Sequence, residues 1–179
     1  MPSGEIRGSG DSHGQRIKAG CSPFDALVNN HRDLSEQFFE LTHQLRRKFE
    51  ISKGVLVLRQ ERPIRLAAVS TWKNGLERDG LMINLPDDSS LFEKVAEQGQ
   101  VYTENFCESF AGNFFERKLL LDDTSCSFLV QPLKSNGHVV GLLGYSSENP
   151  MAFAVCEEGV LEEEAQRFAS AIAARMYPA

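Results

Sequence analysis

The sequence predicts a single layered α+β domain. A stretch near the N-terminus and another at the C-terminus repeat their apolar residues with helical spacing, and short apolar runs separated by turn signals lie between them. Such runs predict strands, and an amphipathic helix buries its apolar face against another layer. We therefore expect a β-sheet packed against two long helices.

Length and composition are typical of one globular domain. The chain has 179 residues, of which 41% are hydrophobic and 25% are charged. A chain of this length can bury a core without disulfides or a structural metal. The first 22 residues are rich in glycine and contain little to bury, so we expect a flexible tail or linker over residues 1–22 and a folded domain over 23–177.

The charge pattern argues against nucleic acid as a partner. The formal net charge is −6, and the only compact basic run, Arg46 to Lys48, falls in the last turns of a predicted helix, where cations complement the helix dipole. No apolar run resembles a signal peptide or reaches the roughly 20 residues of a membrane span. We expect a cytoplasmic protein with no membrane contact.

The four cysteines predict neither a metal site nor a redox motif. Cys21, Cys107, Cys126 and Cys156 are far apart in the sequence, and no CxxC pair or nearby histidine pair accompanies them. We expect free thiols and no metal ligands.

The first long helix is predicted over Asp25 to Phe49. Its apolar residues recur at alternating steps of three and four, which produces a seam along one side. The seam can pack on a sheet or pair with another chain, and both uses are open. Its residues are Leu27, Leu34, Phe38, Leu41 and Leu45.

Two strands in a hairpin follow. The apolar run Gly54 to Leu58 and the run Ile64 to Thr71 are separated by a turn that ends in Pro63. The unbroken series Val55 to Leu58 predicts a strand that is covered on both faces. The next segment, from Trp72 to Asp88, is polar and predicts a connection.

A short helix and a short strand come next. Ser89 or Ser90 can cap a helix that Gly99 terminates, and the apolar residues of this helix are Leu91, Phe92, Val95 and Ala96. The segment from Gln100 to Phe106 predicts a strand.

A second hairpin and the last helix complete the domain. The apolar segments Cys126 to Lys134 and His138 to Ser147 flank Asn136 and Gly137, and this dipeptide favours a type I′ turn. The last helix is predicted over Glu157 to Met176, and its buried stripe consists of Val160, Leu161, Ala165, Phe168, Ile172 and Met176.

A phenylalanine-rich segment lies between the two hairpins. Phe106, Phe110 and Phe114 are four residues apart and would share one face of a helix that points at the sheet. Such rings could hold a flat or apolar ligand, or they could fill the core of the domain. Trp72 has two similar alternatives, as a pocket wall or as an exposed loop residue.

The order of elements resembles that of a GAF domain. The segments that carry the resemblance are "LPDDSSLFEKVAEQGQVYTENF", "SFLVQPLKSNGHVVGLLGYSS" and "FAVCEEGVLEEEAQRFASAIA", and it extends from about Asp25 to Met176. The resemblance implies a central antiparallel sheet, with two long terminal helices on one face and a pocket on the other. Loops and short helices, including Asn105 to Leu121, would roof this pocket.

The resemblance also implies a role and two sets of residues. GAF domains usually act as sensory or regulatory modules and often dimerise through their terminal helices. The expected dimer interface comprises Leu27, Leu34, Phe38, Leu41, Leu45, Leu161, Phe168 and Ile172. The expected ligand-binding residues are Ser70, Trp72, Phe106, Phe110, Phe114, Cys126 and Phe128.

Specialised branches of the family match less well. Phe153, Glu157 and Glu158 resemble only the end of the signature found in cyclic-nucleotide-binding members. Cys107 and Cys126 could form the thiol pair of a free methionine sulfoxide reductase if the fold brings them together, but acidic residues lie beside both. No histidine is placed as an axial haem ligand, so the sequence identifies no cofactor.

Three hypotheses follow, in decreasing order of support. The first is a regulatory module, without catalysis of its own, that binds a small molecule and signals through its terminal helices to a dimer partner, an effector protein or a further domain. The second is a structural dimerisation module with a core filled by its own side chains. The third is a thiol enzyme related to the methionine sulfoxide reductases.

Overall fold

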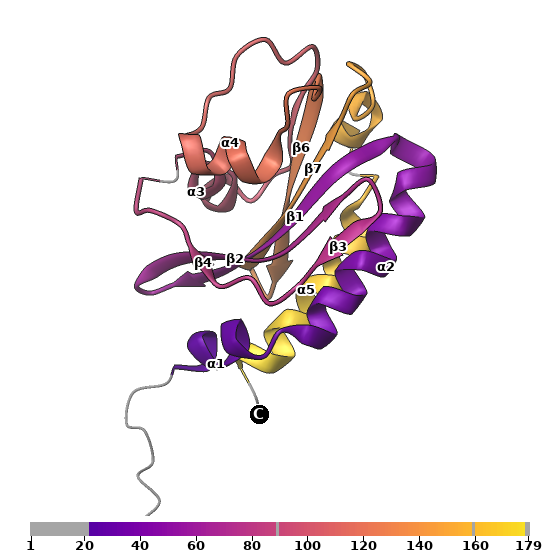
Figure 1. The fold of residues 1–179 in the computed structure, drawn as a ribbon. Helices are drawn as coiled ribbons and strands as arrows, with labels where there is room; N and C mark the ends of the chain where they lie inside the picture. Colours follow the sequence, from indigo (N-terminus) through magenta and orange to yellow (C-terminus); the bar gives the residue numbers. More distant parts are fainter. Residues whose placement is uncertain (1–21, 89, 159, 178–179) are drawn as a thin grey trace, which may run out of the picture.

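The computed structural model of the protein describes residues 22–88, 90–158 and 160–177 (Figure 1). Residues 1–21 of the predicted tail, including Cys21, lie outside the described residues. In chain order the elements are α1 (Pro23–Asn29), α2 (Arg32–Phe49), β1 (Ile51–Glu61), β2 (Ile64–Lys73), β3 (Leu76–Arg78), β4 (Ile83–Asn84), α3 (Ser90–Gln98), β5 (Tyr102–Glu104), α4 (Phe114–Leu120), β6 (Ser127–Ser135), β7 (His138–Ser147), the 3-10 helix η1 (Ala154–Glu158) and α5 (Glu162–Met176). The short strands β3 and β4 lie within the segment from Trp72 to Asp88, which the sequence predicted as a connection.

The strands form one antiparallel sheet. Its order is β3-β2-β1-β7-β6-β5, and β4 pairs with the outer side of β2. Both predicted hairpins, β1–β2 and β6–β7, are present. Asn136 and Gly137 both have positive φ, 51° and 78°, as the predicted type I′ turn requires.

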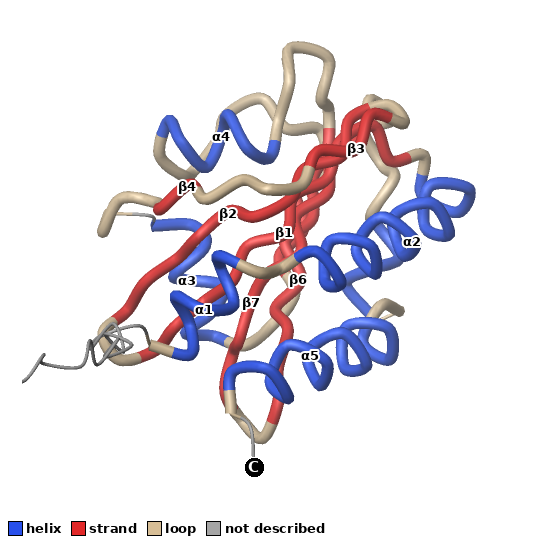
Figure 2. The backbone as a smooth tube through the Cα atoms, turned by 60° about the horizontal axis from the view of Figure 1, so that its bottom comes forward, coloured by secondary structure: helices blue, strands red, loops and turns tan. Residues whose placement is uncertain are grey.

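Helices cover both faces of the sheet (Figures 1 and 2). The long helices α2 and α5, together with α1, pack on one face, and α3 and α4 pack on the other. Strand β1 runs through the middle, so Leu56 and Leu58 face the long helices whereas Val55 and Val57 face α3 and α4. All four side chains are fully buried, which confirms the prediction of a strand covered on both sides.

The first helical segment is divided in two, which the sequence did not predict. The break falls at Asn30 and His31, where the buried His31 ring places Nδ1 2.6 Å from the Val28 carbonyl oxygen. An unbroken helix would use this carbonyl to accept from the Arg32 amide. The Gly80 amide donates to Nε2 of the same ring, at 3.1 Å, so His31 also fastens the loop between β3 and β4.

The apolar seams of the terminal helices are buried inside the chain. Of the residues expected at a dimer interface, all but the partly buried Leu41 are at most 5% exposed and pack against the sheet. They are therefore not accessible to a second chain, and a dimer would need other residues. The last helix begins at Glu162, later than predicted, and Val160 is exposed rather than part of the buried stripe.

We call α3, residues 105–113 and α4 the roof layer. The buried carboxylate of Glu116 connects its two helices. Oε2 accepts from the Phe92 amide at 2.6 Å, and Oε1 accepts from the Leu91 amide at 3.3 Å and the Asn113 amide at 2.8 Å. Asn113 in turn accepts from the Glu116 amide, which completes a capping box. One side chain therefore satisfies amides at the N-termini of both helices.

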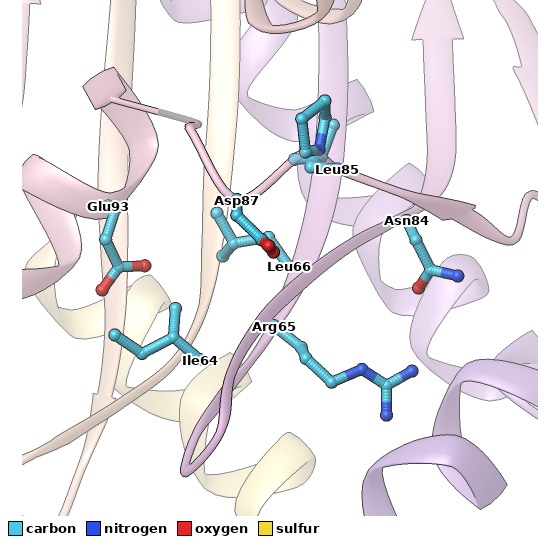
Figure 3. A pocket seen from close by; sticks show the side chains of 8 residues that line it. Ile64, Arg65, Leu66, Asn84, Leu85, Asp87 and Glu93 are labelled. Carbon is cyan, nitrogen blue, oxygen red and sulfur yellow. The ribbon is translucent and has the colours of Figure 1, made fainter.

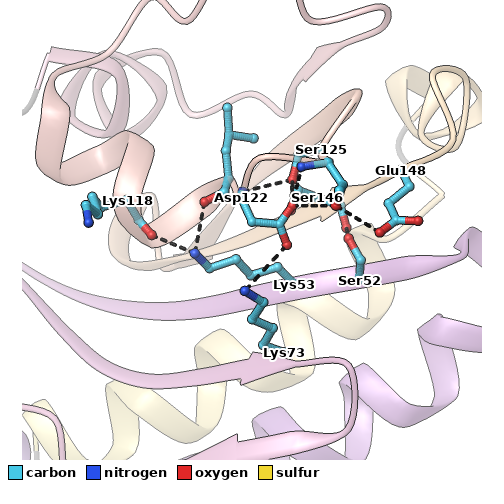
Figure 4. Close-up of polar contacts among 10 residues, drawn as sticks. Ser52, Lys53, Lys73, Lys118, Asp122, Ser125, Ser146 and Glu148 are labelled. Carbon is cyan, nitrogen blue, oxygen red and sulfur yellow. Dashed lines mark hydrogen bonds and ion pairs between the residues drawn. The ribbon is translucent and has the colours of Figure 1, made fainter.

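The sheet holds the other end of α4. The Lys53 ammonium, on β1, donates to the carbonyl oxygens of Lys118 and Leu121, at 2.6 and 2.9 Å (Figure 4). These carbonyls belong to the C-terminal turn of α4, where a cation complements the helix dipole. Burial lowers the pKa of Lys53, and the neighbouring charges of Lys73 and Lys118 lower it further against the opposing effect of Asp122.

A glycine allows α4 to approach the sheet. A Cβ atom on Gly144 of β7 would lie 2.8 Å from Cδ1 of Leu120 and 2.9 Å from Cγ1 of Val55. The missing side chain lets the fully buried Leu120 reach the sheet surface.

We predict that Glu116→Gln destabilises the protein by about 1–3 kcal/mol, because an amide can no longer offer two acceptor oxygens to the three backbone donors. Urea denaturation would measure the loss. The exposed Glu108, in the same layer, supplies the control, and Glu108→Gln should leave the denaturation midpoint unchanged. Equal midpoints for the two variants would contradict the role of Glu116.

We expect the contribution of Asp122 to stability to depend on pH. Burial would raise the pKa of Asp122, but hydrogen bonds from Thr124 and Ser125 outweigh it and hold this pKa below its usual value. In the unfolded protein an aspartate has a pKa of about 3.9, and above this pH the ionised Asp122 stabilises the fold fully. This stabilisation is lost as the pH falls through the lower pKa that Asp122 has in the folded protein.

Asp122→Asn should therefore destabilise the protein at pH 6, and the difference should shrink as the pH falls through the lowered pKa of Asp122, because the parent carboxylate then gains a proton. Denaturation curves of parent and variant over a series of pH values from 6 downward provide the measurement. If the unfolding free energies of parent and variant differ by the same amount at every pH, the ionised form of Asp122 is not what stabilises the fold.

Candidate functional site

The space beneath the roof layer contains the chain's own side chains. Phe92, Leu120 and Phe128 are at most 1% exposed and meet Val55 and Val57 of the central strand there. This is the region in which the resemblance places a ligand. Fifteen buried hydrophobic side chains form this core: Val55, Val57, Leu66, Ala68, Leu85, Leu91, Phe92, Val95, Ala96, Leu120, Leu121, Phe128, Val130, Val139 and Leu142.

The three evenly spaced phenylalanines do not share a helical face. Residues 105–113 form no helix, and α4 begins only at Phe114. Phe106 is 63% exposed and Phe114 is 66% exposed, so neither ring lines the interior. Only Phe110 turns inward, where its ring lies 5.5 Å from that of Phe128. The expectation of one aromatic face directed at the sheet is therefore wrong.

Ser70 and Trp72 lie on the opposite face of the sheet from the roof layer. The pairing of β1 with β2 changes register between Leu56 and Val57, where Val69 is the extra residue of a β-bulge. Leu66 and Ala68 point toward the roof layer, but after the bulge Ser70 hydrogen-bonds Ser35 of α2 and Trp72 is buried under α2. Neither residue can line a pocket beneath the roof layer.

The two remaining expected residues lie on the roof side. Phe128 is fully buried between the rings of Tyr102 and Phe110. Cys126 is half-buried just before β6, and its carbonyl oxygen accepts from the Cys107 amide at 2.7 Å. The structure therefore brings together Phe110, Phe128, Cys126 and Cys107.

A pocket opens at the edge of this region, between β2, the segment that leads into α3, and α3 itself (Figure 3). We call it the β2–α3 pocket. Its volume is about 180 Å³, and Leu66 and Leu85, which belong to the core beneath the roof layer, form its apolar part. The full lining is Ile64, Arg65, Leu66, Asn84, Leu85, Pro86, Asp87 and Glu93.

Charged side chains surround the β2–α3 pocket. Glu93 lies across the hollow from Arg65 and Asn84 (Figure 3). Glu93 pairs with the buried Arg59, and although burial alone would lower the pKa of the Arg59 guanidinium, its bonds to Glu93 raise it above the usual value. Asp87 is exposed at the rim, so the pocket has two carboxylates at its border.

Arg65 connects the pocket to the first helix. Its guanidinium donates to Asp25 of α1 at 2.8 Å and lies 5.0 Å from the centre of the Phe24 ring. Hydrogen bonds from Ser22 and Arg65 lower the pKa of Asp25. The pocket therefore borders both the roof layer, through Glu93, and the helical face, through Arg65.

Sequence reasoning did not select the residues of this pocket. They come from a strand, a polar connection and a helix, and no local motif joins them. The sequence feature that could have indicated the pocket is Pro86, which follows the apolar Leu85 in the polar connection and precedes the predicted helix α3.

The described part of the chain was expected to contain no metal ligands and no membrane span. Within residues 22–88, 90–158 and 160–177, no group of three or more His, Cys, Asp or Glu side chains could hold a metal ion. Among the helices of this part of the chain, none is both long and apolar enough to cross a membrane.

Solved structures share this fold at low sequence identity. The GAF domain of a two-component sensor histidine kinase from Bacillus halodurans is 19% identical, with a TM-score of 0.62 over 78% of this chain and 92% of that one. The GAF domain of a phosphoenolpyruvate-protein phosphotransferase from Coxiella burnetii is also 19% identical, with a TM-score of 0.62 over 85% and 90%.

An enzyme is among the similar structures. The type II free methionine-R-sulfoxide reductase from Thermoplasma acidophilum is 15% identical, with a TM-score of 0.61 over 79% of this chain and 94% of that one. The sequence matches no curated protein. A family model described as GAF domain matches residues 33–174. Because this match spans well over half of the sequence, the chain belongs to the GAF domain family.

Proposed function

We propose that this GAF domain is a regulatory module that binds a small polar molecule in the β2–α3 pocket. GAF domains generally act as regulatory or sensory modules, and a similar structure belongs to a sensor histidine kinase. The observation that carries the proposal is the position of the pocket, which meets the core beneath the roof layer and also borders α1 through Arg65.

The size and charge of the pocket restrict the ligand class. A volume of about 180 Å³ is below the roughly 300–1,000 Å³ of pockets for drug-sized ligands. The carboxylates of Asp87 and Glu93 favour an ammonium group, and Leu66 and Leu85 favour a short apolar portion. The lining is therefore best suited to a small amine or an amino acid.

Binding can be transmitted in two directions. An ammonium group near Glu93 would compete with Arg59 and so act on α3, which Glu116 joins to α4. A carboxylate group near Arg65 would compete with Asp25 and so act on α1. A ligand that favours one arrangement of these pairs shifts the population of the conformations in which they differ.

A second candidate is a closed structural module that binds no small molecule. The observation that favours it is the complete burial of Phe92, Leu120 and Phe128, which fill the layer beneath the roof. In this case the exposed rings of Phe114 and Phe115, on the outer side of α4, are the more direct candidates for contact with another protein.

Ligand binding is tested by thermal shift and native mass spectrometry with a panel of amines and amino acids. A true ligand at about 100 times its Kd should stabilise the protein by about 2.7 kcal/mol. Asp87→Asn should reduce the shift, because it removes an exposed rim carboxylate without breaking any core contact.

The control is Glu97→Gln, an exposed position on α3 outside the pocket, which should keep the full shift. A ligand whose effect survives Asp87→Asn and Asn84→Ala would bind elsewhere and refute the pocket. No stabilisation by any compound of the panel would favour the closed structural module.

The surroundings of Cys107 do not favour reductase chemistry. Burial raises the pKa of the Cys107 thiol, and the Glu104 carboxylate raises it further, although Arg117 opposes them. A catalytic thiol needs the opposite shift. We expect no turnover of free methionine sulfoxide in the presence of a thiol reductant, measured by chromatography of the product methionine. Turnover that is lost in Cys107→Ser and in Cys126→Ser would establish an enzyme.

A further inference from the structure

Two cysteines that are 19 residues apart in the sequence lie side by side in space. The Cys107 amide donates to the Cys126 carbonyl oxygen at 2.7 Å. Given standard backbone dimensions, this hydrogen bond limits the separation of the two Cα atoms to about 6.6 Å. Disulfides bridge Cα atoms that are roughly 4.4–6.8 Å apart. The backbone is therefore already within the range that a disulfide requires.

The two thiols are also partly accessible. Both residues are half-buried, and both cysteines are free in the structure. Burial and the Glu104 carboxylate raise the pKa of Cys107, and the charge of a Cys126 thiolate adds to this effect, so the two thiols are within electrostatic range of each other. At present each thiol contacts a carbonyl oxygen of its own loop, that of Ser109 at 3.7 Å for Cys107 and that of Thr124 at 3.6 Å for Cys126. Because these contacts are weak, little energy is lost when either cysteine side chain rotates.

The two cysteines belong to different parts of the fold. The Cys126 amide donates to the Ser147 carbonyl at 2.8 Å, which fixes this residue to the sheet. Cys107 belongs to the long connection between β5 and α4, at one end of the sheet (Figure 1). Its neighbour Phe106 has a φ of 51°, a left-handed conformation that is costly for an aromatic residue, and exposes 63% of its surface.

We propose that Cys107 and Cys126 form a reversible disulfide that fastens the connection between β5 and α4 to the start of β6. With oxidised glutathione as the oxidant, the thiolate of one cysteine attacks the glutathione disulfide and releases one glutathione thiolate. The second cysteine thiolate then attacks the mixed disulfide and releases the other. The protein loses two protons and two electrons, and two glutathione thiols are formed.

The disulfide would restrain the roof layer. The ring that it closes contains all of α4, which Glu116 and Lys53 already hold at its two ends. A third attachment would reduce the freedom of residues 105–113 without altering the sheet. The oxidation state of the thiols would thus control how readily the roof layer moves.

The test uses the full chain, incubated with oxidised glutathione, alkylated and digested with trypsin without reduction. Cleavage after Lys94, Arg117, Lys118 and Lys134 places the two cysteines in separate peptides, 95–117 and 119–134. We expect these peptides to be joined, lighter by two hydrogen atoms than the sum of the free peptides, and to separate on reduction. The oxidised protein should also unfold at a higher temperature than the reduced protein.

Matched variants control the assignment. Cys156→Ser, which removes a buried thiol, should keep the linked peptides. Cys126→Ser should abolish them and the rise in unfolding temperature, and circular dichroism would verify that the variant is folded. Glu104→Gln should accelerate linkage, because removing this charge lowers the pKa of Cys107.

Two results would overturn the proposal. One is a folded parent protein that carries only glutathione adducts on Cys107 and Cys126, with no link between the peptides. The other is a link that joins either cysteine to Cys21, to Cys156 or to a second chain. Because the readout is a covalent bond and needs neither a ligand nor methionine sulfoxide, it is independent of the proposed function.

Discussion

The buried Glu116 carboxylate is the interaction on which the roof layer depends. Helices α3 and α4 are short, with nine and seven residues, and helices of this length are not stable alone. Glu116 accepts hydrogen bonds at the N-terminus of each, while Lys53 holds the last turn of α4 and Gly144 lets Leu120 reach the sheet. Polar bonds thus set the position of this layer, and apolar packing fills the space that they define.

This arrangement explains why the pocket is found at the border of the roof layer. Beneath its centre, the side chains of both helices and of β1 occupy the volume that a ligand would need. At the border, α3 meets the polar connection that follows β4. The peptide groups of such a connection are less completely buried than those of a helix or strand. The proposed small polar ligand would bind there without displacing the core. The GAF fold is therefore compatible with a sensor whose interior is closed.

Much of the fold could be predicted from the sequence, because helical and strand periodicities determine which residues face a core. The hairpins, the doubly covered β1 and the burial of Phe168 and Ile172 follow from such patterns. The positions of Ser70 and Trp72 could not be predicted, since one extra residue at Val69 reverses the faces of β2. The even spacing of the three phenylalanines did not predict where their rings lie, because residues 105–113 do not form the helix on which such a spacing would align them.

The bulge at Val69 has a consequence for the whole molecule. It places Val69 and Ser70 one after the other on the helical face, so that Ser70 and Trp72 lie under α2, whereas Leu66 and Ala68 before the bulge face the roof layer. The inserted residue thereby decides which face of the sheet receives the Trp72 ring, since without it the alternation of β2 would direct this ring toward the roof layer.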